Sequence, residues 1–141
     1  MNIGFTGTRK GMTEIQRIML RVFLESVIKN IKPAKLEFHH GDCVGADSEA
    51  HDIAKSLGIF VVVHPPTDPK HRAHKEGDII FQPQEYLDRN KDIVDACDSM
   101  IAMSKTFHEV VRSGTWSTVR YAKLVGKPVI VFLPNGEGVP E

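Results

Sequence analysis

The sequence predicts an α/β fold, a three-layer sandwich in which helices cover both faces of a five-stranded parallel sheet. Short apolar segments of strand type alternate along the chain with longer segments whose apolar residues recur at helical spacing. Glycine-containing turns follow the first two strand segments, where each strand must turn sharply into a helix. This alternation favours parallel strands joined by right-handed crossovers, for which we predict the strand order 3-2-1-4-5.

The composition indicates one domain with no dominant charge. The chain has 141 residues, 41% of them hydrophobic, and its formal net charge is zero. We therefore expect a single domain over residues 1–141 that neither coats nucleic acid nor binds a membrane. No apolar run reaches the ~18 residues that span a bilayer. The first residues enter a strand pattern with no sign of a signal peptide, and two cysteines outside any C-x-x-C pair fit a reducing, cytoplasmic setting.

The first strand is expected at residues 2–6, and a long helix follows it. This helix starts at Thr13, with Gln16 as its partner in a capping box, and ends before residue 33. Further apolar residues widen its surface beyond one face, which makes a homo-oligomer plausible. The buried face is predicted to consist of Ile15, Ile18, Met19, Val22, Phe23 and Val27, and the widening comes from Leu20, Leu24 and Ile28.

The second strand, residues 35–40, leads into the segment 41–58, which we predict to be a glycine turn followed by a helix. Gly41 and Gly45 lie where the strand turns, and Ala46 and Ala50 let the helix approach the sheet closely. Free N–H groups at such a helix start form a natural seat for phosphate. The alternative is a plain connection that binds nothing, since a short glycine pattern is a weak signal.

The remaining elements follow at regular intervals. Residues 59–64 form a β-branched run typical of a strand buried on both faces. A polar loop over 66–83 precedes a helix over 84–97, a strand over 98–103 and a second loop over 104–113. A last helix over 115–125 ends at Gly126, a fifth strand follows over 129–133, and the tail from residue 134 has no regular pattern.

Three turns should converge at the carboxyl edge of the sheet, at the switch point where ligands of such folds bind. They span residues 7–11, 41–45 and 113–115, and each supplies glycine, hydroxyl or backbone N–H groups. This convergence predicts a phosphate-bearing ligand. The expected contacts are Thr6, Gly7, Thr8, Arg9, Gly41, Asp42, Cys43, Gly45, Asp47, Ser113, Gly114, Thr115 and Trp116.

Several of these residues have a second interpretation. Arg9 could pair with a phosphate or be a solvated surface residue. Asp47 could bind a ribose or stabilise the start of its own helix. Trp116 could stack on a base or cover the sheet or a dimer contact. No base is clearly paired with Cys43, so it is not expected to be a nucleophile.

Metal and cofactor sites are not expected. His71 and His74 have the spacing of a metal pair, but zinc needs three or four ligands and this loop offers no supporting cysteine or acid spacing.

The order of the motifs resembles the SLOG superfamily, which includes DNA processing protein A (Smf) and the Lonely Guy cytokinin-activating phosphoribohydrolases. The opening IGFTGTRKG resembles its first-strand turn, and residues 113–115 resemble its S-G-[ST] and P-G-G-x-G-T turns. GDCVGADSEAHDIAKSLG is similar to the G-x-A-R-G-x-D-x-x-A-H pattern, with Gly45, Asp47, Ala50 and His51 matching. The small YspA-like members are closest in length. The resemblance implies a Rossmann-like fold.

The segment 89–94 resembles the R-N-R-x-I segment of DNA processing protein A. The resemblance implies that Arg89, Asn90 and Asp92 face the ligand pocket. Taken alone, these residues would indicate a solvated helix face.

The chain departs from the superfamily pattern at two places. Val44 stands where the A-R-G-x-D turn has arginine. Ser117 and Thr118 stand where the Lonely Guy hydrolases place glutamates, including the catalytic carboxylate. Because cleavage of an N-glycosidic bond needs a carboxylate near the ribose, these departures favour binding over hydrolysis.

Three functions therefore follow from the sequence. The leading one is binding of a nucleotide or nucleotide-derived ligand by a sensor, carrier or sequestering protein. The first alternative is a nucleoside 5′-monophosphate phosphoribohydrolase, an N-glycosidase with relocated carboxylates. The second is single-stranded DNA binding through Arg9, Lys10 and the loop 70–75, which the zero net charge disfavours. The relocated carboxylates would come from Asp42, Asp47, Asp92 and Glu109, with Asp47 and Asp92 as the leading catalytic candidates.

Overall fold

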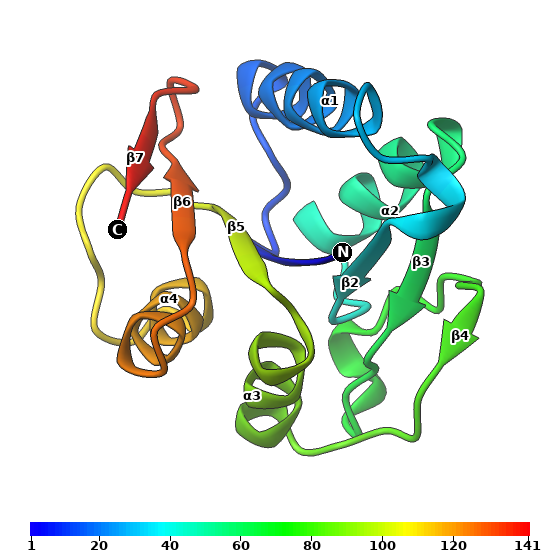
Figure 1. The fold of residues 1–141 in the computed structure, drawn as a ribbon. Coiled ribbons are helices and arrows are strands. Elements are labelled where there is room, and N and C mark those ends of the chain that lie inside the picture. Colours follow the sequence, from blue (N-terminus) through cyan, green and yellow to red (C-terminus); the bar gives the residue numbers. More distant parts are fainter.

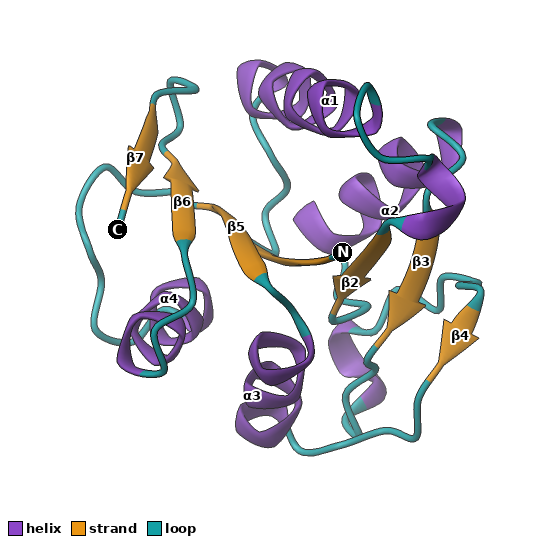
Figure 2. Ribbon diagram, viewed as in Figure 1, coloured by secondary structure: helices purple, strands orange, loops and turns teal.

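The computed structural model describes residues 1–141 as a twisted sheet with helices on both faces (Figures 1 and 2). The strands are β1 (Asn2–Gly7), β2 (Glu37–His40), β3 (Phe60–Val63), β4 (Ile79–Ile80), β5 (Ser99–Met103), β6 (Val129–Phe132) and β7 (Gly138–Pro140). The helices are α1 (Glu14–Ile28), α2 (Ala46–Ser56), α3 (Tyr86–Ala96) and α4 (Gly114–Leu124). Short 3₁₀ turns occupy Pro33–Lys35 and Pro69–His71.

The sheet confirms the predicted α/β sandwich, but the prediction of five strands is wrong. Seven strands lie in the order β4-β3-β2-β1-β5-β6-β7, and all neighbours are parallel except β6 and β7. The five expected segments are β1, β2, β3, β5 and β6, which lie side by side as β3-β2-β1-β5-β6. Because β4 and β7 extend the sheet at its two edges, the complete order differs from the predicted one.

Both additional strands are short edge strands. β4 pairs with β3 through Val62–Ile79 and Val63–Ile80, inside the loop predicted to be irregular. β7 pairs with β6 after a turn in which the Gly136 N–H donates to the Leu133 carbonyl oxygen at 2.8 Å. Asn-Gly is a strong hairpin signal because it tolerates positive φ, and Gly136 has a φ of 87°. The expectation of an unstructured tail is therefore wrong.

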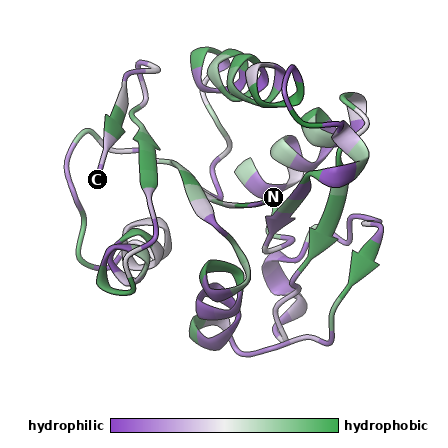
Figure 3. Ribbon diagram, viewed as in Figure 1, coloured by the Kyte–Doolittle hydropathy of each residue, from purple (hydrophilic) through white to green (hydrophobic).

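Two apolar layers hold the helices to the sheet. On one face, α1 and α2 pack over a core that includes Phe5, Phe38 and Leu20. On the other face, α3 and α4 pack over a smaller core that includes Met100 and Val131. Figure 3 shows that β3 and β6 are hydrophobic along nearly their whole length, as expected for strands covered on both sides.

The start of α1 is capped as predicted, and the cap also reaches the sheet. Thr13 and Gln16 form a capping box. Gln16 is buried, and its side-chain amide donates to the carbonyl oxygens of Ser104 at 2.8 Å and Phe132 at 2.9 Å. This amide therefore ties α1 to the carboxyl ends of β5 and β6.

The predicted buried face of α1 is wrong in part. Leu20 and Leu24 are fully buried, whereas Ile15, Ile18 and Val22 are 42%, 49% and 53% exposed. The other three residues of the predicted face are partly buried. Apolar side chains surround much of this helix, so periodicity alone does not select the face that meets the sheet. Even α1, the longest helix, lacks the length and apolar character needed to cross a membrane.

Candidate functional site

A cavity of about 520 Å³ opens at the carboxyl edge of the sheet, beside the ends of β1 and β5. This is the topological switch point, because β1 lies between β2 and β5 and the chain moves across the sheet in opposite directions on its two sides. The glycine turn after β2 and the starts of α3 and α4 complete the walls. Most predicted ligand residues line this cavity: Thr6, Gly7, Thr8, Arg9, Gly41, Cys43, Asp47, Arg89, Asn90, Ser113, Gly114 and Thr115.

Three predicted ligand residues lie outside the cavity lining, and each has a structural role. Asp42 is a fully buried residue of the glycine turn itself. Gly45 begins α2 with a φ of 86°, and a Cβ there would collide with the Arg9 carbonyl group. Trp116 is 5% exposed in the core under α3 and α4, and its indole N–H donates to Thr106 Oγ1 at 3.1 Å. Trp116 therefore covers the sheet.

Only one of the four candidate catalytic carboxylates lines the cavity. Asp92 is exposed on another side of α3, beside a separate hollow of about 510 Å³. Glu109 is ion-paired with Arg120 at 2.8 Å, and Asp42 is buried away from the cavity. Asp47 remains as the one carboxyl group of the lining.

The cavity lining is strongly cationic. Arg9, Lys10, Lys105 and Arg112 all line it, and none of them forms an ion pair within the chain. A cleft lined by charges of one sign concentrates counter-ions, here anions. Lys105 and Arg112 were not among the predicted ligand residues, although their position on the loop that leads to residues 113–115 was a usable signal.

The start of α4 offers hydrogen-bond donors to this cavity. Ser113 is the N-cap, and its Oγ accepts the Trp116 N–H at 3.2 Å, which leaves the hydroxyl proton of Ser113 available. The backbone N–H groups of Gly114 and Thr115 have no acceptor within the chain. Unpaired N–H groups at a helix start favour an anion through hydrogen bonding and the helix dipole.

Asp47 is a buried residue of the cavity lining. It is 6% exposed, and its Oδ2 accepts the Cys43 N–H at 3.2 Å. Burial raises the pKa of Asp47 to about 6, although the nearby Arg89 guanidinium favours the ionised form. A buried carboxyl group that titrates near neutrality beside a cavity is a candidate for proton transfer or ligand recognition.

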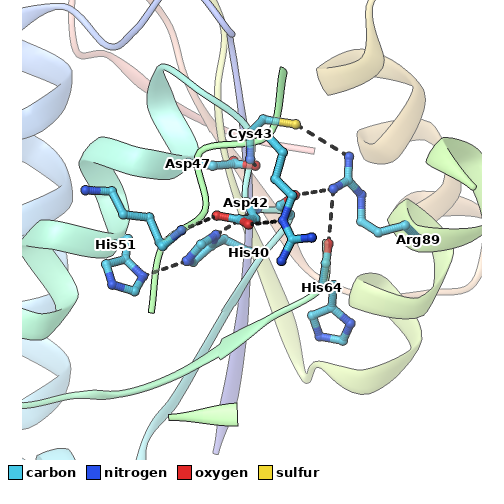
Figure 4. Close-up of polar contacts among 10 residues, drawn as sticks. His40, Asp42, Cys43, Asp47, His51, His64 and Arg89 are labelled. Atoms are coloured by element: carbon cyan, nitrogen blue, oxygen red, sulfur yellow. Dashed lines mark hydrogen bonds and ion pairs between the residues drawn. The ribbon is translucent and has the colours of Figure 1, made fainter. Parts of the chain in front are cut away.

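Arg89 fastens the glycine turn to α3 (Figure 4). It is 2% exposed and donates to the carbonyl oxygens of Gly41 and, at 3.1 Å, His64. Its guanidinium lies over the Tyr86 ring, 4.8 Å from the centroid. Arg89 thus shapes one wall of the cavity with most of its donors already engaged.

The surroundings of Cys43 favour the neutral thiol. Its Sγ lies 3.4 Å from the Tyr86 hydroxyl and 3.7 Å from an Arg89 nitrogen. Burial, followed by the neighbouring Asp47, raises the pKa of the thiol despite Arg89. Because the thiolate is the reactive form, this environment disfavours nucleophilic chemistry at Cys43.

Asp42 holds residues 71–75, hereafter the strap, against the glycine turn. Its carboxylate accepts from Arg72 Nε at 3.0 Å and from the Lys75 N–H at 2.9 Å, and its carbonyl oxygen accepts the Ala73 N–H at 2.7 Å. Asp42 adopts a φ of 58°, which aspartate tolerates better than most residues. The strap carries His71 to the cavity, so part of the polar loop is attached to the site.

Four buried histidines, hereafter the histidine cluster, lie behind the glycine turn. His39 Nδ1 is 2.8 Å from His64 Nε2. His40 Nε2 is 2.9 Å from His51 Nδ1 (Figure 4). His40 Nδ1 accepts the Asp42 N–H at 3.0 Å, so a neutral His40 carries its proton on Nε2 and donates it to His51. Burial lowers the pKa of all four, that of His64 to about 3.

The cluster has no arrangement for a metal ion. No group of three or more histidine, cysteine or acidic side chains in the structure is arranged to hold a metal ion. The sequence alone did not indicate this cluster, because the contacts of His39 and His40 with His64 and His51 depend on how β2 packs against β3 and α2.

Comparisons with known proteins identify the fold. No protein-family model matches the chain, and no curated protein is significantly similar to it in sequence. Among solved structures, the chain is similar to the molybdenum cofactor binding protein of the phototrophic bacterium Rippkaea orientalis, with a TM-score of 0.69 and 21% identity over 94% of this chain and 76% of that one. It is similar to the Moco carrier protein of Chlamydomonas reinhardtii, with a TM-score of 0.62 and 20% identity over 94% and 75%.

A third similar structure is the X-ray structure of TM1055, with a TM-score of 0.63 and 14% identity over 91% of this chain and 71% of that one. At these identities the likeness concerns the fold alone. It supports the Rossmann-like architecture that the superfamily resemblance implied, and membership of the SLOG superfamily stays a prediction.

Proposed function

We propose that this protein binds a nucleotide or a nucleotide-derived, phosphate-bearing ligand in the cavity, as a carrier, sensor or sequestering protein. The observation that carries the proposal is the charge of the lining: Arg9, Lys10, Lys105 and Arg112 lack ion-pair partners there, and Asp47 is the one carboxyl group. Cationic side chains and free helix N–H groups together form the usual recognition chemistry for phosphate.

Binding without hydrolysis is favoured by the shortage of carboxylates. Glycoside hydrolysis normally uses a pair of them on either side of the scissile bond. Thr118 lines the cavity where the superfamily resemblance places a glutamate, and its hydroxyl donates to the Gly114 carbonyl oxygen at 2.9 Å. Asp47 alone could protonate a leaving base but leaves the attacking water without a partner.

The molybdenum cofactor is a second ligand to test. The names of two proteins with this fold describe binding or carrying that cofactor, and each is matched over 94% of the present chain. We propose it as an alternative occupant of the same cavity.

Calorimetric titration with AMP and with adenosine tests the proposed function. AMP should bind at least a hundredfold more tightly than adenosine, because each hydrogen bond between phosphate and a charged group contributes about 1.5–3 kcal/mol. Equal affinities would contradict a phosphate-binding cavity. Native mass spectrometry and elemental analysis of gently purified protein would separate a bound nucleotide from a bound molybdenum species.

The phosphoribohydrolase alternative has its own test. It predicts release of free base from AMP by purified protein, lost when Asp47→Asn removes the one ionisable carboxyl group of the cavity. Turnover by wild type that disappears in this variant would replace the carrier role with an enzyme.

We also propose that α1 forms a contact with a second copy of the chain. Ile15, Ile18 and Val22 lie along one exposed face, and an antiparallel pair of α1 helices would place Glu14 of one copy near Lys29 of the other. Light scattering should show a dimer that Val22→Glu dissociates.

A matched control for this contact is Leu124→Glu on α4, where the leucine is 82% exposed. This variant should leave the dimer intact. A monomeric wild-type protein would contradict the contact.

A further inference from the structure

We infer that the cavity is built for a ligand with two adjacent anionic groups, such as the diphosphate of a nucleoside diphosphate, in preference to a phosphate monoester. The inference rests on the proposed function and narrows its ligand class. Its basis is that two separate loops present equivalent sets of anion-binding groups to one cavity.

The first set, hereafter the α4 seat, comprises residues 112–115 with Lys105. Two backbone N–H groups, those of Gly114 and Thr115, have no acceptor, and the Ser113 hydroxyl retains its proton as a donor. Arg112 and Lys105 add two cationic side chains without ion-pair partners. These groups are sufficient to bind the oxygens of one phosphate group.

The second set, hereafter the β1 seat, comprises residues 8–10 in the turn after β1. The Arg9 N–H has no acceptor in the chain. Thr8 Oγ1 accepts the Lys10 N–H at 3.1 Å, so the Thr8 hydroxyl proton is free to donate outward. The side chains of Arg9 and Lys10 line the cavity without ion-pair partners.

The Arg9 side chain contacts another residue of the cavity lining, Tyr86. Its guanidinium lies over the Tyr86 ring at the start of α3, 5.4 Å from the ring centroid. A cation–π contact of this kind restricts the side chain while leaving its N–H donors available. The β1 seat therefore has a cation held in place before any ligand arrives.

The two seats line the same cavity, which is walled by the loops after the neighbouring parallel strands β1 and β5. Thr6 pairs with Ala102 and Gly7 with Met103, so the loops after the two strands leave the sheet together. Because both loops line one cavity of about 520 Å³, a single ligand with two linked phosphate groups can reach both seats.

Charge balance points the same way. A phosphate monoester carries about −1.5 to −2 charges at neutral pH, so it would balance one seat and leave the cations of the other facing each other. A diphosphate supplies a second group to the remaining seat. The one carboxyl group of the lining, Asp47, accepts the Cys43 N–H and forms no ion pair with either seat.

Paired titrations test this inference. In EDTA at fixed ionic strength, ADP should bind at least tenfold more tightly than AMP, and pyrophosphate at least tenfold more tightly than phosphate. Arg9→Ala and Arg112→Ala should each weaken ADP binding about tenfold or more. The affinity for AMP should fall strongly in only one of these two variants. Lys32→Ala, an exposed lysine before β2 and so at the opposite edge of the sheet, is the matched control and should change neither affinity.

The possible outcomes separate the inference from the proposed function. Equal affinities for AMP and ADP, or loss of ADP binding in only one of the two arginine variants, would overturn the two-seat inference and leave phosphate binding intact. Failure of all four compounds to bind would overturn the proposed function and the inference with it. Circular dichroism should show that each variant is folded like wild type. Any loss of affinity can then be attributed to the substituted seat.

Discussion

The two halves of the sheet's carboxyl edge differ in how their polar groups are paired. Behind β2 and β3, Asp42 and the histidine cluster are buried and hydrogen-bonded to one another or to the strap. Beside β1 and β5, the cations of the two seats have no ion-pair partners, and three backbone N–H groups have no acceptor. No buried side-chain nitrogen or oxygen in the protein lacks a partner.

This difference separates a supporting region from a binding region. A buried polar group without a partner costs about 1–3 kcal/mol, so the β2–β3 half must be internally satisfied for the chain to fold. Donors at the edge of an open cavity are hydrated and need no partner until a ligand replaces the water. Substitutions should therefore reduce stability in the first half and affinity in the second.

The largest loss of stability is expected for Asp42→Asn. The substitution keeps the size of the side chain and its tolerance of positive φ but removes the charge that Arg72 meets at 3.0 Å. Breaking a buried ion pair from one side costs about 3–5 kcal/mol, measured as the free energy of unfolding in urea. Asp52→Asn, at the 65% exposed partner of Lys75, is the control and should change it by less than about 0.5 kcal/mol. Equal losses of stability in Asp42→Asn and Asp52→Asn would contradict the assignment of Asp42 to a supporting region.

Acidification should destabilise the protein through the histidine cluster. Burial lowers the pKa of all four histidines. Below about pH 6.5 these histidines are therefore protonated in the unfolded chain but stay neutral in the native state. Each proton bound only by the unfolded chain lowers the free energy of unfolding by about 1.4 kcal/mol per pH unit. We expect a loss of about 2–4 kcal/mol between pH 6.5 and 5.

Urea titrations at several pH values would measure this loss. His51→Gln should reduce the dependence on pH, and His108→Gln, at an exposed loop histidine, should preserve it. Stability that is flat across this range would show that the cluster accepts protons without cost.

Asp47→Asn should have a smaller effect of opposite sign. Burial raises the pKa of Asp47 to about 6, so stability falls as the pH rises from about 4, where this carboxyl group ionises in the unfolded chain, to about 6, where it also ionises in the native state. The neutral amide avoids this, and stability at pH 7.5 should increase by about 1–3 kcal/mol, with the gain vanishing near pH 4. Asp92→Asn, on exposed α3 surface, should give no gain. Destabilisation by Asp47→Asn at pH 7.5 would mean that the ionised group is favoured.

The smallest change in stability is expected in the two seats. Arg112→Ala and Lys105→Ala remove exposed side chains without ion pairs, so the free energy of unfolding should change by less than about 0.5 kcal/mol. When the urea titration is repeated with a saturating nucleotide, the two variants should be less stable than wild type, because the nucleotide stabilises them less. A large loss in the free protein would assign these cations to the supporting region.

Sequence reasoning located the cavity better than the supporting region. The convergence of glycine turns follows from the order of elements, so residues near Gly7, Gly41 and Gly114 could be assigned to one edge before their geometry was known. Asp42 could not be interpreted correctly, because its role depends on a strap that begins some 30 residues further on. The contact between His39 and His64 likewise depends on strand register, which no local pattern encodes.

The errors in the fold have equally specific causes. α1 has apolar side chains on several sides, and the burial of Gln16 depends on carbonyl groups at the ends of β5 and β6. β4 is only two residues long, below the length at which alternation is visible. The Asn135-Gly136 pair is a hairpin signal from which β7 could have been predicted. The polar residues around this pair made the signal hard to recognise.

The position of Trp116 gives the protein an intrinsic optical reporter. It is the one tryptophan of the chain, and its indole hydrogen bond to Thr106 links it to a residue of the cavity lining. Occupation of the α4 seat would alter the polarity around that loop and hence the wavelength and yield of indole fluorescence. Ligand affinity and exchange rates can therefore be followed by fluorescence in the unlabelled protein, with Thr106→Val as the variant that uncouples the signal from the site.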